Sequence, residues 1–413
     1  MSPHLIQPVE EAVNRFYPGL LPAVKCGLAV VGSMALKGRT KPLSIMFETP
    51  SGYGKSAVAQ MFYPLDGNGL DQYIYRCDKF TPKSFVSHAA NVAHSQLKKI
   101  DLLPKLANKT LVTKELSPIF RGREEDMQEN FSVLIAVLDG KGFVSDSGVK
   151  GHRGYEYNIV FNWIGATTPL PRKTHRLMYQ LGTRLLFYET PAIEPTEDAL
   201  LAYAERDDVS EAETECQRAV NGFLVGFFKQ HPIGSVPPES VSIPKDLLRE
   251  LSRWALFVAH GRREIKYEKS ICEWEPISAS KPEGPWKIVN YFKELARTHA
   301  LIHERTQVEP SDLEVVANVA LSSIPIHLRP IVRKLRQDGS ITSTECCAIL
   351  NVSRPTAIRY LTELKLLGIG TLEKGSVPEN RPDTLTLSPE FSWLASATPL
   401  TTNGVCVMES EER

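Results

Sequence analysis

The sequence predicts an α/β fold with a parallel five-stranded sheet, followed by a helical region and a small C-terminal unit. Three observations lead to this fold class. Short apolar runs alternate with longer amphipathic ones over residues 41–190, a glycine-rich turn follows the first run, and the apolar spacing becomes mainly helical after residue 191. The runs expected to form strands are Leu43 to Phe47, Gln72 to Cys77, Thr110 to Thr113, Ile159 to Gly165 and Leu185 to Tyr188.

Length and composition are those of a soluble globular chain with more than one domain. The 413 residues include 48 Lys or Arg and 48 Asp or Glu, so any binding to nucleic acid or membrane must come from local patches. Seven cysteines occur without a CxxC pair, which argues against a disulfide framework or a zinc ribbon. We find no apolar run of 18 residues and no secretion-type start, and we expect a cytoplasmic protein that does not act at a membrane.

The glycine-rich turn from Thr49 to Ser56 predicts a P-loop, a cradle for a nucleoside triphosphate. Glycines at 52 and 54 let the backbone direct N–H groups at phosphate oxygens, and the lysine that follows adds a positive charge. The Ser56 hydroxyl is placed to hold Mg²⁺. The expected binding residues for ATP are Pro50, Ser51, Gly52, Tyr53, Gly54, Lys55 and Ser56. The full signature has glycine where Thr49 stands.

Hydrolysis of ATP also requires an acidic group at a strand end beside the P-loop. Glu115, after the third predicted strand, stands where a carboxylate would polarise the attacking water. Lys114 occupies the position usually held by aspartate, and it either supplements Lys55 at the phosphates or points away. In the second case Mg²⁺ is left to Ser56, water and a carboxylate such as Asp78. An alternative that stays open is that Glu115 is only the first-turn acid of the next helix.

A second glycine-rich stretch, residues 139–155, precedes the fourth predicted strand. Its glycine density predicts a hairpin with positive charge at its tip, from Lys150, His152 and Arg153. A polar strand end, Ala166-Thr167-Thr168, comes shortly afterwards.

With this passage the chain resembles the AAA+ ATPases that carry a hairpin before the sensor-1 strand, a group that includes minichromosome-maintenance helicases and bacterial enhancer-binding activators. The resemblance rests on Leu138 to Phe143 and on Ile164 to Thr168, and it covers residues 40–325. It implies ATPase activity, a helical lid, self-association into a ring or filament, and a hairpin that touches DNA or a partner.

The resemblance also assigns site residues by position. Thr168, with Thr167 as the second choice, falls at sensor 1, a polar side chain between the P-loop and the water. Arg184 falls at the arginine finger that reaches the γ-phosphate held by the adjacent subunit, with Arg176 in reserve. Lys287 falls at the sensor-2 position of the lid, where the family carries arginine. The loop with which the activators grip the sigma factor is not recognisable.

The C-terminal segment predicts a winged helix-turn-helix unit. Helices are expected over Ile326 to Gln337, Ser343 to Leu350 and Thr356 to Leu367, with a hairpin wing over Thr371 to Thr386. The side chains expected to face DNA are Ser353, Arg354, Thr356, Arg359 and Tyr360 on the third helix, with Lys374 and Arg381 on the wing. Many modules of this kind bind only protein.

The chain is thereby divided into four regions and a tail. These are N-terminal helices (1–40), an AAA+ core (41–190), a helical lid with an insertion or long loop near 264–285 (191–325), a winged helix-turn-helix (326–396) and a disordered tail (397–413).

Two classes of function follow, and both stay open. The favoured one is an AAA+ ATPase that couples ATP binding and hydrolysis to remodelling, loading or unwinding of DNA, duplex or single-stranded, alongside a replication or transcription protein. The alternative is an ATP-gated DNA-binding regulator or adaptor with little or no hydrolysis, which Lys114 favours. A metabolic kinase with an appended domain is a third class, disfavoured by the lid and the C-terminal unit.

Overall fold

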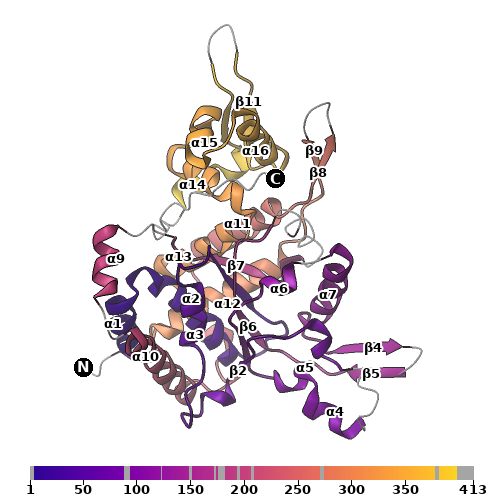
Figure 1. Ribbon diagram of the computed structural model, residues 1–413, viewed down its shortest axis with the longest axis vertical. Coiled ribbons are helices and arrows are strands. Elements are labelled where there is room, and N and C mark those ends of the chain that lie inside the picture. Colours follow the sequence, from indigo (N-terminus) through magenta and orange to yellow (C-terminus); the bar gives the residue numbers. More distant parts are fainter. Residues whose placement is uncertain are drawn as a thin grey trace.

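The computed structural model describes residues 4–87, 94–121, 123–147, 151–171, 174, 182–192, 196–205, 209–269, 274–376 and 381–397. In this part of the chain a central sheet is surrounded by helices, and a smaller C-terminal unit lies above it (Figure 1). The predicted tail, apart from Ala397, lies outside the described residues.

The central sheet is parallel and has five strands in the order β2-β3-β6-β1-β7. Its strands are β1 Ser44–Glu48, β2 Ile74–Arg76, β3 Thr110–Thr113, β6 Asn162–Thr167 and β7 Leu186–Glu189. The five predicted strands and the α/β fold class are therefore confirmed. Because β1 lies between β6 and β7, the turn that follows β1 stands beside the carboxyl ends of both neighbours.

Each strand divides its side chains between two hydrophobic cores, one on each face of the sheet. In β1, Ile45 and Phe47 enter the first core and Met46 enters the second. The first core is shared with α1 Gln7–Phe16, α2 Leu21–Gly32 and α3 Lys55–Met61. The second core lies against α5 Leu102–Lys105, α6 Ser117–Phe120 and α7 Glu124–Val137. Helix α4 His94–Ile100 precedes α5 in the chain.

Helices follow the sheet, as predicted for residues 191–325. They are α9 Glu197–Ala204, α10 Val209–Gln230, α11 Lys245–Gly261, α12 Trp286–Ile302 and α13 Pro310–Ser322. Helix α13 covers the outer edge of β7, where the backbone N–H groups of Phe187 and Glu189 donate to serine hydroxyls at 3.0 and 2.9 Å. The acceptors, Ser323 and Ser322, thereby satisfy an edge that would otherwise expose unpaired backbone groups.

The first hydrophobic core contains a stretch that the sequence analysis missed. Pro18–Ala35 spans 18 residues and is apolar enough, by length and composition, to cross a membrane, so the prediction of no such run was wrong. In the structure this stretch includes α2, and 72% of it is buried within the fold. Its composition is explained by packing, because α2 lies between the sheet and α12.

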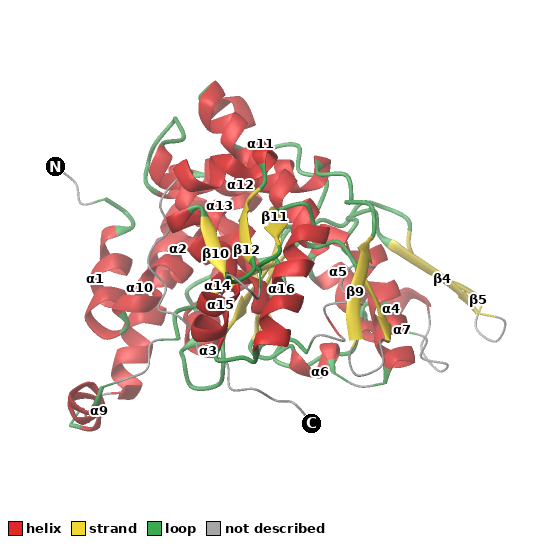
Figure 2. Cartoon of the chain, turned by 90° about the horizontal axis from the view of Figure 1, so that it is seen from above, coloured by secondary structure: helices red, strands yellow, loops and turns green. Residues whose placement is uncertain are grey.

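The predicted hairpin before the fourth long strand is present. It consists of β4 Phe143–Ser147 and β5 Gly151–Tyr155, paired in antiparallel fashion, and it projects away from the sheet (Figure 2). The residues 148–150 at its turn, including Lys150, lie outside the described residues.

The C-terminal unit contains the three predicted helices and a three-stranded sheet. Its elements are α14 Arg329–Asp338, β10 Ser340–Thr342, α15 Ser343–Leu350, α16 Arg354–Leu366, β11 Gly370–Glu373 and β12 Thr384–Leu387. The strand order is β10-β12-β11, all antiparallel. Strand β10, at three residues, is too short to show a pattern in the sequence.

The turn between α15 and α16 follows the predicted chemistry. Thr342 and Glu345 form a capping box at the start of α15, and Asn351 ends the helix in the left-handed region, with a φ of 50°. One expectation was wrong, since Tyr360 faces the interior and its ring lies 4.8 Å from that of His327. The helical spacing places Tyr360 beside the buried Ala357 and Leu361, and the inward side of α16 is wider than expected.

The polar stretch near 264–285 was expected to be an insertion or long loop, and the prediction of a loop was wrong. It contains an antiparallel hairpin, β8 Ile265–Lys269 and β9 Trp274–Ala279. In β8 the half-buried Ile265 and Tyr267 alternate with the exposed Lys266 and Glu268, a signal only four residues long that was missed. Strand β9, with Pro276 in its middle, shows no regular alternation. The hairpin contacts the C-terminal unit, because the Tyr267 hydroxyl donates to Glu363 Oε1 of α16 at 2.9 Å.

Aromatic side chains fix the C-terminal unit to the rest of the chain. Trp254 of α11 meets Trp393 edge to face, with ring centroids 5.0 Å apart, and Phe257 meets Phe391 at 6.2 Å. Both partners belong to the short helical segment Pro389–Ser396. The C-terminal unit therefore shares the first hydrophobic core with the sheet.

We expect the packing of α2 against the helix after the P-loop to be intolerant of added volume. At Gly27 a Cβ atom would lie 2.4 Å from Cζ of the buried Phe62, so Gly27→Val should lower the free energy of unfolding by about 1–3 kcal/mol. Denaturant midpoints measure this loss. The control is Gly19→Val, where nothing lies within 4 Å and we expect a change within about 0.5 kcal/mol. Equal effects of the two substitutions would contradict the packing.

Candidate functional site

The turn after β1 has the conformation that a phosphate cradle requires. Gly52 and Gly54 have φ angles of 92° and 83°, in the left-handed region that side chains with a Cβ avoid. Helix α3 begins immediately afterwards, at Lys55. A Cβ at Gly54 would also lie 2.7 Å from a methyl carbon of Leu20, so only glycine fits. The backbone N–H groups of this turn and of the start of α3 can therefore gather around an anion.

Lys55 stands at the centre of this turn. Lys55 is only 5% exposed, and among the described residues its ammonium has a single weak contact, with the Pro50 carbonyl at 3.5 Å. Burial lowers the pKa of Lys55, and the Glu115 carboxylate acts in the opposite direction. A buried ammonium with so weak a partner fits a triphosphate. The half-buried Ser56 and Glu115 supply the hydroxyl and carboxylate oxygens that suit Mg²⁺.

A polar cluster joins the ends of β3 and β6 beside the P-loop. The Ser117 hydroxyl lies 2.8 Å from the Thr168 hydroxyl, and Arg121 Nη2 donates to the same Thr168 oxygen at 3.0 Å. The backbone N–H of Ser117 donates to Glu115 Oε1 at 2.8 Å. The structure thus brings the predicted residues Glu115 and Thr168 together, through Ser117.

Arg121 was missed by the sequence analysis. It follows the four-residue helix α6 and places a guanidinium on the predicted sensor side chain. The available signal was a basic residue six positions after Glu115, at the end of the segment that starts with Ser117. An exposed arginine in a polar turn is common, and that signal is weak.

The two interpretations of Glu115 both describe part of its environment. Its carboxylate accepts from the first N–H of α6, as an acid at a helix start does. It is also close enough to Lys55 to raise the pKa of that ammonium, which places it at the P-loop.

Lys114 is exposed, and its charge acts on Asp78. Partial burial works to raise the pKa of Asp78, but hydrogen bonds from Arg76 and Tyr63 and the charges of Arg76 and Lys114 lower it below its usual value. Arg76 Nη2 contacts one Asp78 oxygen at 2.8 Å and the Tyr63 hydroxyl donates to the other. Asp78 is therefore engaged by its neighbours rather than left for Mg²⁺.

The carboxylate that ends β1 is buried directly before the P-loop. Glu48 is 0% exposed, and its Oε2 lies 2.6 Å from Nη2 of Arg329 in α14, which is also 0% exposed. Its Oε1 accepts from the backbone N–H of Leu170, in the loop after Thr168, at 3.2 Å. One side chain thus joins the end of β1, the loop after β6 and the C-terminal unit.

A second acid extends this buried network. Glu189 ends β7, lies 3.9 Å from Arg329 Nη1 and pairs with Arg333, one turn further along α14. Burial raises the pKa of Glu48, Arg329 opposes this rise, and the charge of Glu189 adds to it. The sequence analysis missed the network because Glu48, Glu189 and the two arginines come from three segments more than 130 residues apart. Its one signal was that β1 and β7 each end in glutamate.

Arg184 and Lys287 meet on one carboxylate, Asp139. Arg184 Nη2 lies 2.8 Å from Asp139 Oδ2, while Lys287 Nζ and Lys41 Nζ lie 3.2 and 3.4 Å from Oδ1. Burial works to raise the pKa of Asp139, but the hydrogen bonds and charges of Arg184 and Lys287 lower it to about 2. The carboxylate is therefore ionised at neutral pH.

This cluster lies at the end of β1 opposite to the P-loop. A Cβ at Gly140, next to Asp139, would lie 2.5 Å from the carbonyl oxygen of Thr40, before β1 begins. A five-residue strand is about 17 Å long. Lys287 therefore lies away from the P-loop of its own chain in this structure, and its sensor-2 role stays a prediction. Arg184, predicted to act on a neighbouring subunit, stays a prediction, and its substitute Arg176 lies outside the described residues.

The residues predicted to contact DNA lie mainly on the surface. In the hairpin, His152 is exposed and lies 3.1 Å from Glu156 and 3.9 Å from Asp146, so acids accompany it. Arg153 is half-buried. On the wing, Lys374 and Arg381 are exposed.

The start of α16 presents the other predicted contacts. Ser353 and Arg354 are exposed, Thr356 and Arg359 are half-buried, and the Ser353 and Thr356 hydroxyls lie 3.0 Å apart. These side chains remain together at one helix end. Their role in binding DNA stays a prediction.

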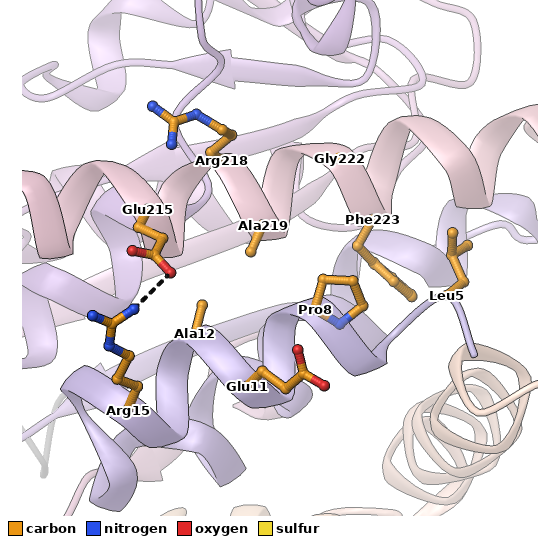
Figure 3. A pocket seen from close by; sticks show the side chains of 10 residues that line it. All are labelled: Leu5, Pro8, Glu11, Ala12, Arg15, Glu215, Arg218, Ala219, Gly222 and Phe223. Carbon is orange, nitrogen blue, oxygen red and sulfur yellow. Dashed lines mark ion pairs between the residues drawn. The ribbon is translucent and has the colours of Figure 1, made fainter. Parts of the chain in front are cut away.

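A cavity of about 600 Å³ lies between α1 and α10, away from the P-loop (Figure 3). Pro8, Ala12 and Phe223 give it apolar walls, and Arg15 and Glu215 form a 3.7 Å ion pair across one end. Among the described residues that line it are the carboxylates Glu11 and Glu215 but no Ser, Thr, Cys or His, so we assign it no chemistry.

Two histidines, His299 and His303, have an acid beside them. His299 Nδ1 lies 2.7 Å from Asp312 Oδ1, and His303 is within the same group. Arg305 Nη2 contacts the same Asp312 oxygen at 2.6 Å, and it would repel a metal ion. Burial lowers the pKa of His303 to about 4, with nearby His299, Lys25 and Arg305 adding to the effect. This cluster is a structural ion pair at the start of α13.

Comparison with known proteins adds little to this description. No family model matches the sequence, and no curated protein matches it. Among solved structures, a candidate ATPase from Cytophaga hutchinsonii is 12% identical, with a TM-score of 0.39, over 78% of this chain and 86% of that chain. A likeness this weak carries no functional argument. The sheet order and the P-loop themselves define the chain as a P-loop α/β protein.

We expect the buried pair of Glu48 and Arg329 to be essential for folding. Arg329→Met leaves the carboxylate buried and unpaired, and should lower the free energy of unfolding by about 3–5 kcal/mol at neutral pH. Without Arg329 the pKa of Glu48 rises further, so the folded state holds the proton more tightly than the unfolded state. The deficit should therefore shrink as the pH falls. Denaturant titrations at several pH values measure it.

The matched control is the double variant Glu48→Gln with Arg329→Met. It removes both charges, and we expect it to recover most of the stability that Arg329→Met loses. A single variant within about 1 kcal/mol of the native protein would contradict the buried pair.

Proposed function

We propose that this protein is an ATPase of the AAA+ class that acts on DNA, with Mg²⁺ as its metal. One observation carries the proposal: the P-loop with its buried Lys55 stands at the carboxyl end of β1, and Glu115 and Thr168 stand at the ends of the two strands beyond it. A triphosphate cradle next to an acid and a polar sensor is the arrangement that hydrolysis requires.

Each residue of the site has a role in this proposal. The glycine turn and the start of α3 bind the phosphates, Lys55 adds its charge, and Ser56 holds the metal ion, which neutralises phosphate charge during transfer. Glu115 orients the attacking water and accepts its proton. Thr168, held by Ser117 and Arg121, fixes the position of that water beside the γ-phosphate.

Three features support DNA as the partner. The β4–β5 hairpin projects from the sheet, α16 presents Ser353, Arg354 and Thr356 at one end, and the C-terminal unit has the order of elements of a winged helix. The buried network at Glu48 joins that unit to the P-loop, so binding at one can influence the other. A cytoplasmic location and a ring or filament are part of the same proposal.

A second function is favoured by Lys114. An exposed lysine stands where the family carries a metal-binding aspartate, and Asp78 is held by Arg76 and Tyr63. Glu115 is the one carboxylate close to Lys55 in the described part of the chain. With so few acids at the phosphates, the protein could bind ATP as a regulator or adaptor on DNA and hydrolyse little of it.

Steady-state ATPase assays without DNA, with single-stranded DNA and with duplex DNA distinguish the two. For the ATPase we expect turnover in the native protein, its loss in Lys55→Ala, and a fall of roughly 100-fold or more in Glu115→Gln. Controls are Lys245→Ala and Glu125→Gln, both exposed and away from the P-loop. ATP binding without turnover under all three conditions would support the regulator, and absence of ATP binding would exclude both.

Mixing two inactive variants tests whether Arg184 acts on a neighbouring subunit. Arg184→Ala keeps its own P-loop, and Lys55→Ala keeps its own Arg184. If Arg184 completes the site of the adjacent subunit, mixed assemblies regain part of the activity that each variant lacks. If Arg184 serves only its intrachain pair with Asp139, mixing restores nothing.

A further inference from the structure

A second cavity, of about 320 Å³, lies at the amino end of β1, at the opposite end of the strand from the P-loop. It is formed by residues 36–41, before β1, and by the first three turns of α12. Its lining is strongly basic, with one carboxylate, Glu294. The basic residues are Lys37, Arg39, Lys41, Lys287, Lys293 and Arg297.

Some of these cations are already paired. Arg39 contacts Glu294 at 2.9 Å, and Asp139 is shared by Lys41, Lys287 and Arg184. Glu239 acts on Arg297 from outside the cavity. Positive charges still outnumber the carboxylates around them, and the cavity attracts anions.

A buried hydroxyl in the wall of this cavity lacks a partner. Tyr291 is 3% exposed, and its hydroxyl makes no hydrogen bond with the described residues. Burial raises the pKa of Tyr291 well above its usual value, so the group stays a neutral donor. Arg39, Arg184, Asp139 and Glu294 are the charged groups around it. A buried donor without an acceptor is costly. The hydroxyl oxygen is shielded from solvent, so a small shift of the Tyr291 side chain toward the cavity would let an anionic oxygen satisfy it.

An aromatic side chain stands at the edge of the same cavity. Trp286, the first residue of α12, is 78% exposed, the largest exposure among the large hydrophobic side chains described. An exposed indole beside a basic cavity offers a flat surface on which a nucleobase can stack.

We propose that this cavity binds single-stranded DNA, with a phosphate against Lys37, Lys293 and the Tyr291 hydroxyl and its base on Trp286. The inference deepens the proposed function, and rests on it for DNA as the partner. The volume of the cavity, about 320 Å³, is at the small end for ligand sites and suits one nucleotide unit at a time. In a duplex both faces of each base are stacked, so only an unpaired base can use Trp286.

The test measures binding of a fluorescein-labelled oligothymidylate by anisotropy, on the full chain without ATP. We expect Trp286→Ala to weaken binding roughly tenfold, because stacking of one base is lost. The matched control is Trp274→Ala on β9, also exposed at 57%, which should leave the affinity unchanged. The double variant Lys37→Ala with Lys293→Ala should weaken binding and flatten its dependence on salt.

Tyr291→Phe removes only the hydroxyl and separates a binding role from a structural one. We expect weaker oligonucleotide binding together with unchanged or higher thermal stability, since a buried unsatisfied group is gone. Lower stability with unchanged affinity would overturn the role of Tyr291 at the phosphate.

Three other outcomes would overturn the site. They are absence of oligothymidylate binding by the native chain, equal losses in Trp286→Ala and Trp274→Ala, and displacement of the oligonucleotide by free ATP in Lys55→Ala. The last would show a second mononucleotide site. The ATPase assay distinguishes the two failures: turnover that persists while Trp286→Ala keeps full affinity sinks this site alone, whereas absence of ATP binding sinks the proposed function.

Discussion

A carboxylate and a guanidinium, both shielded from water, hold this molecule together between the end of β1 and the start of α14. Neither Glu48 nor Arg329 is stable in the interior without the other, since each isolated charge would cost several kcal/mol. Their contact fixes where the C-terminal unit lies on the sheet, and Glu189 with Arg333 repeats the contact at the end of β7. The C-terminal unit thus packs on the carboxyl ends of β1 and β7 and is not a separate module.

That placement connects the P-loop to the C-terminal unit through Glu48, the residue directly before it. Thr49 follows Glu48 directly, and Leu170 donates to the same carboxylate from the loop after Thr168. The start of the phosphate cradle and the sensor loop therefore share one buried anchor with α14. The expected domain boundary at residue 326 separates Glu48 from Arg329 along the chain, although the two are in contact. It also separates Trp254 from Trp393, whose rings pack against each other.

Local features were predictable from the sequence, and pairings between distant residues were not. Apolar runs reveal strands such as β3, and Gly-Lys-Ser after a strand reveals the P-loop, because those patterns depend on neighbours along the chain. Lys287 was assigned by position in a resemblance, and its real partner, Asp139, comes from a segment 148 residues away. Tyr360 was placed outward because its face of α16 borders the exposed one, and the contact with His327 depends on tertiary packing. The β8–β9 hairpin alternates only in β8, over four residues, and so short a pattern is easily missed in a polar stretch.

The attraction of Asp139 sets how strongly an anion on another molecule must attract Arg184 to draw it away. One carboxylate attracts three cations, so each of them is held by only part of its charge. Should Arg184 turn to an anion on another molecule, Lys41 and Lys287 would remain to neutralise the carboxylate it leaves. Asp139, whose side chain is 31% exposed, would then still have two cations beside it. Whether Arg184 leaves Asp139 for another molecule would then depend on how much negative charge that molecule carries.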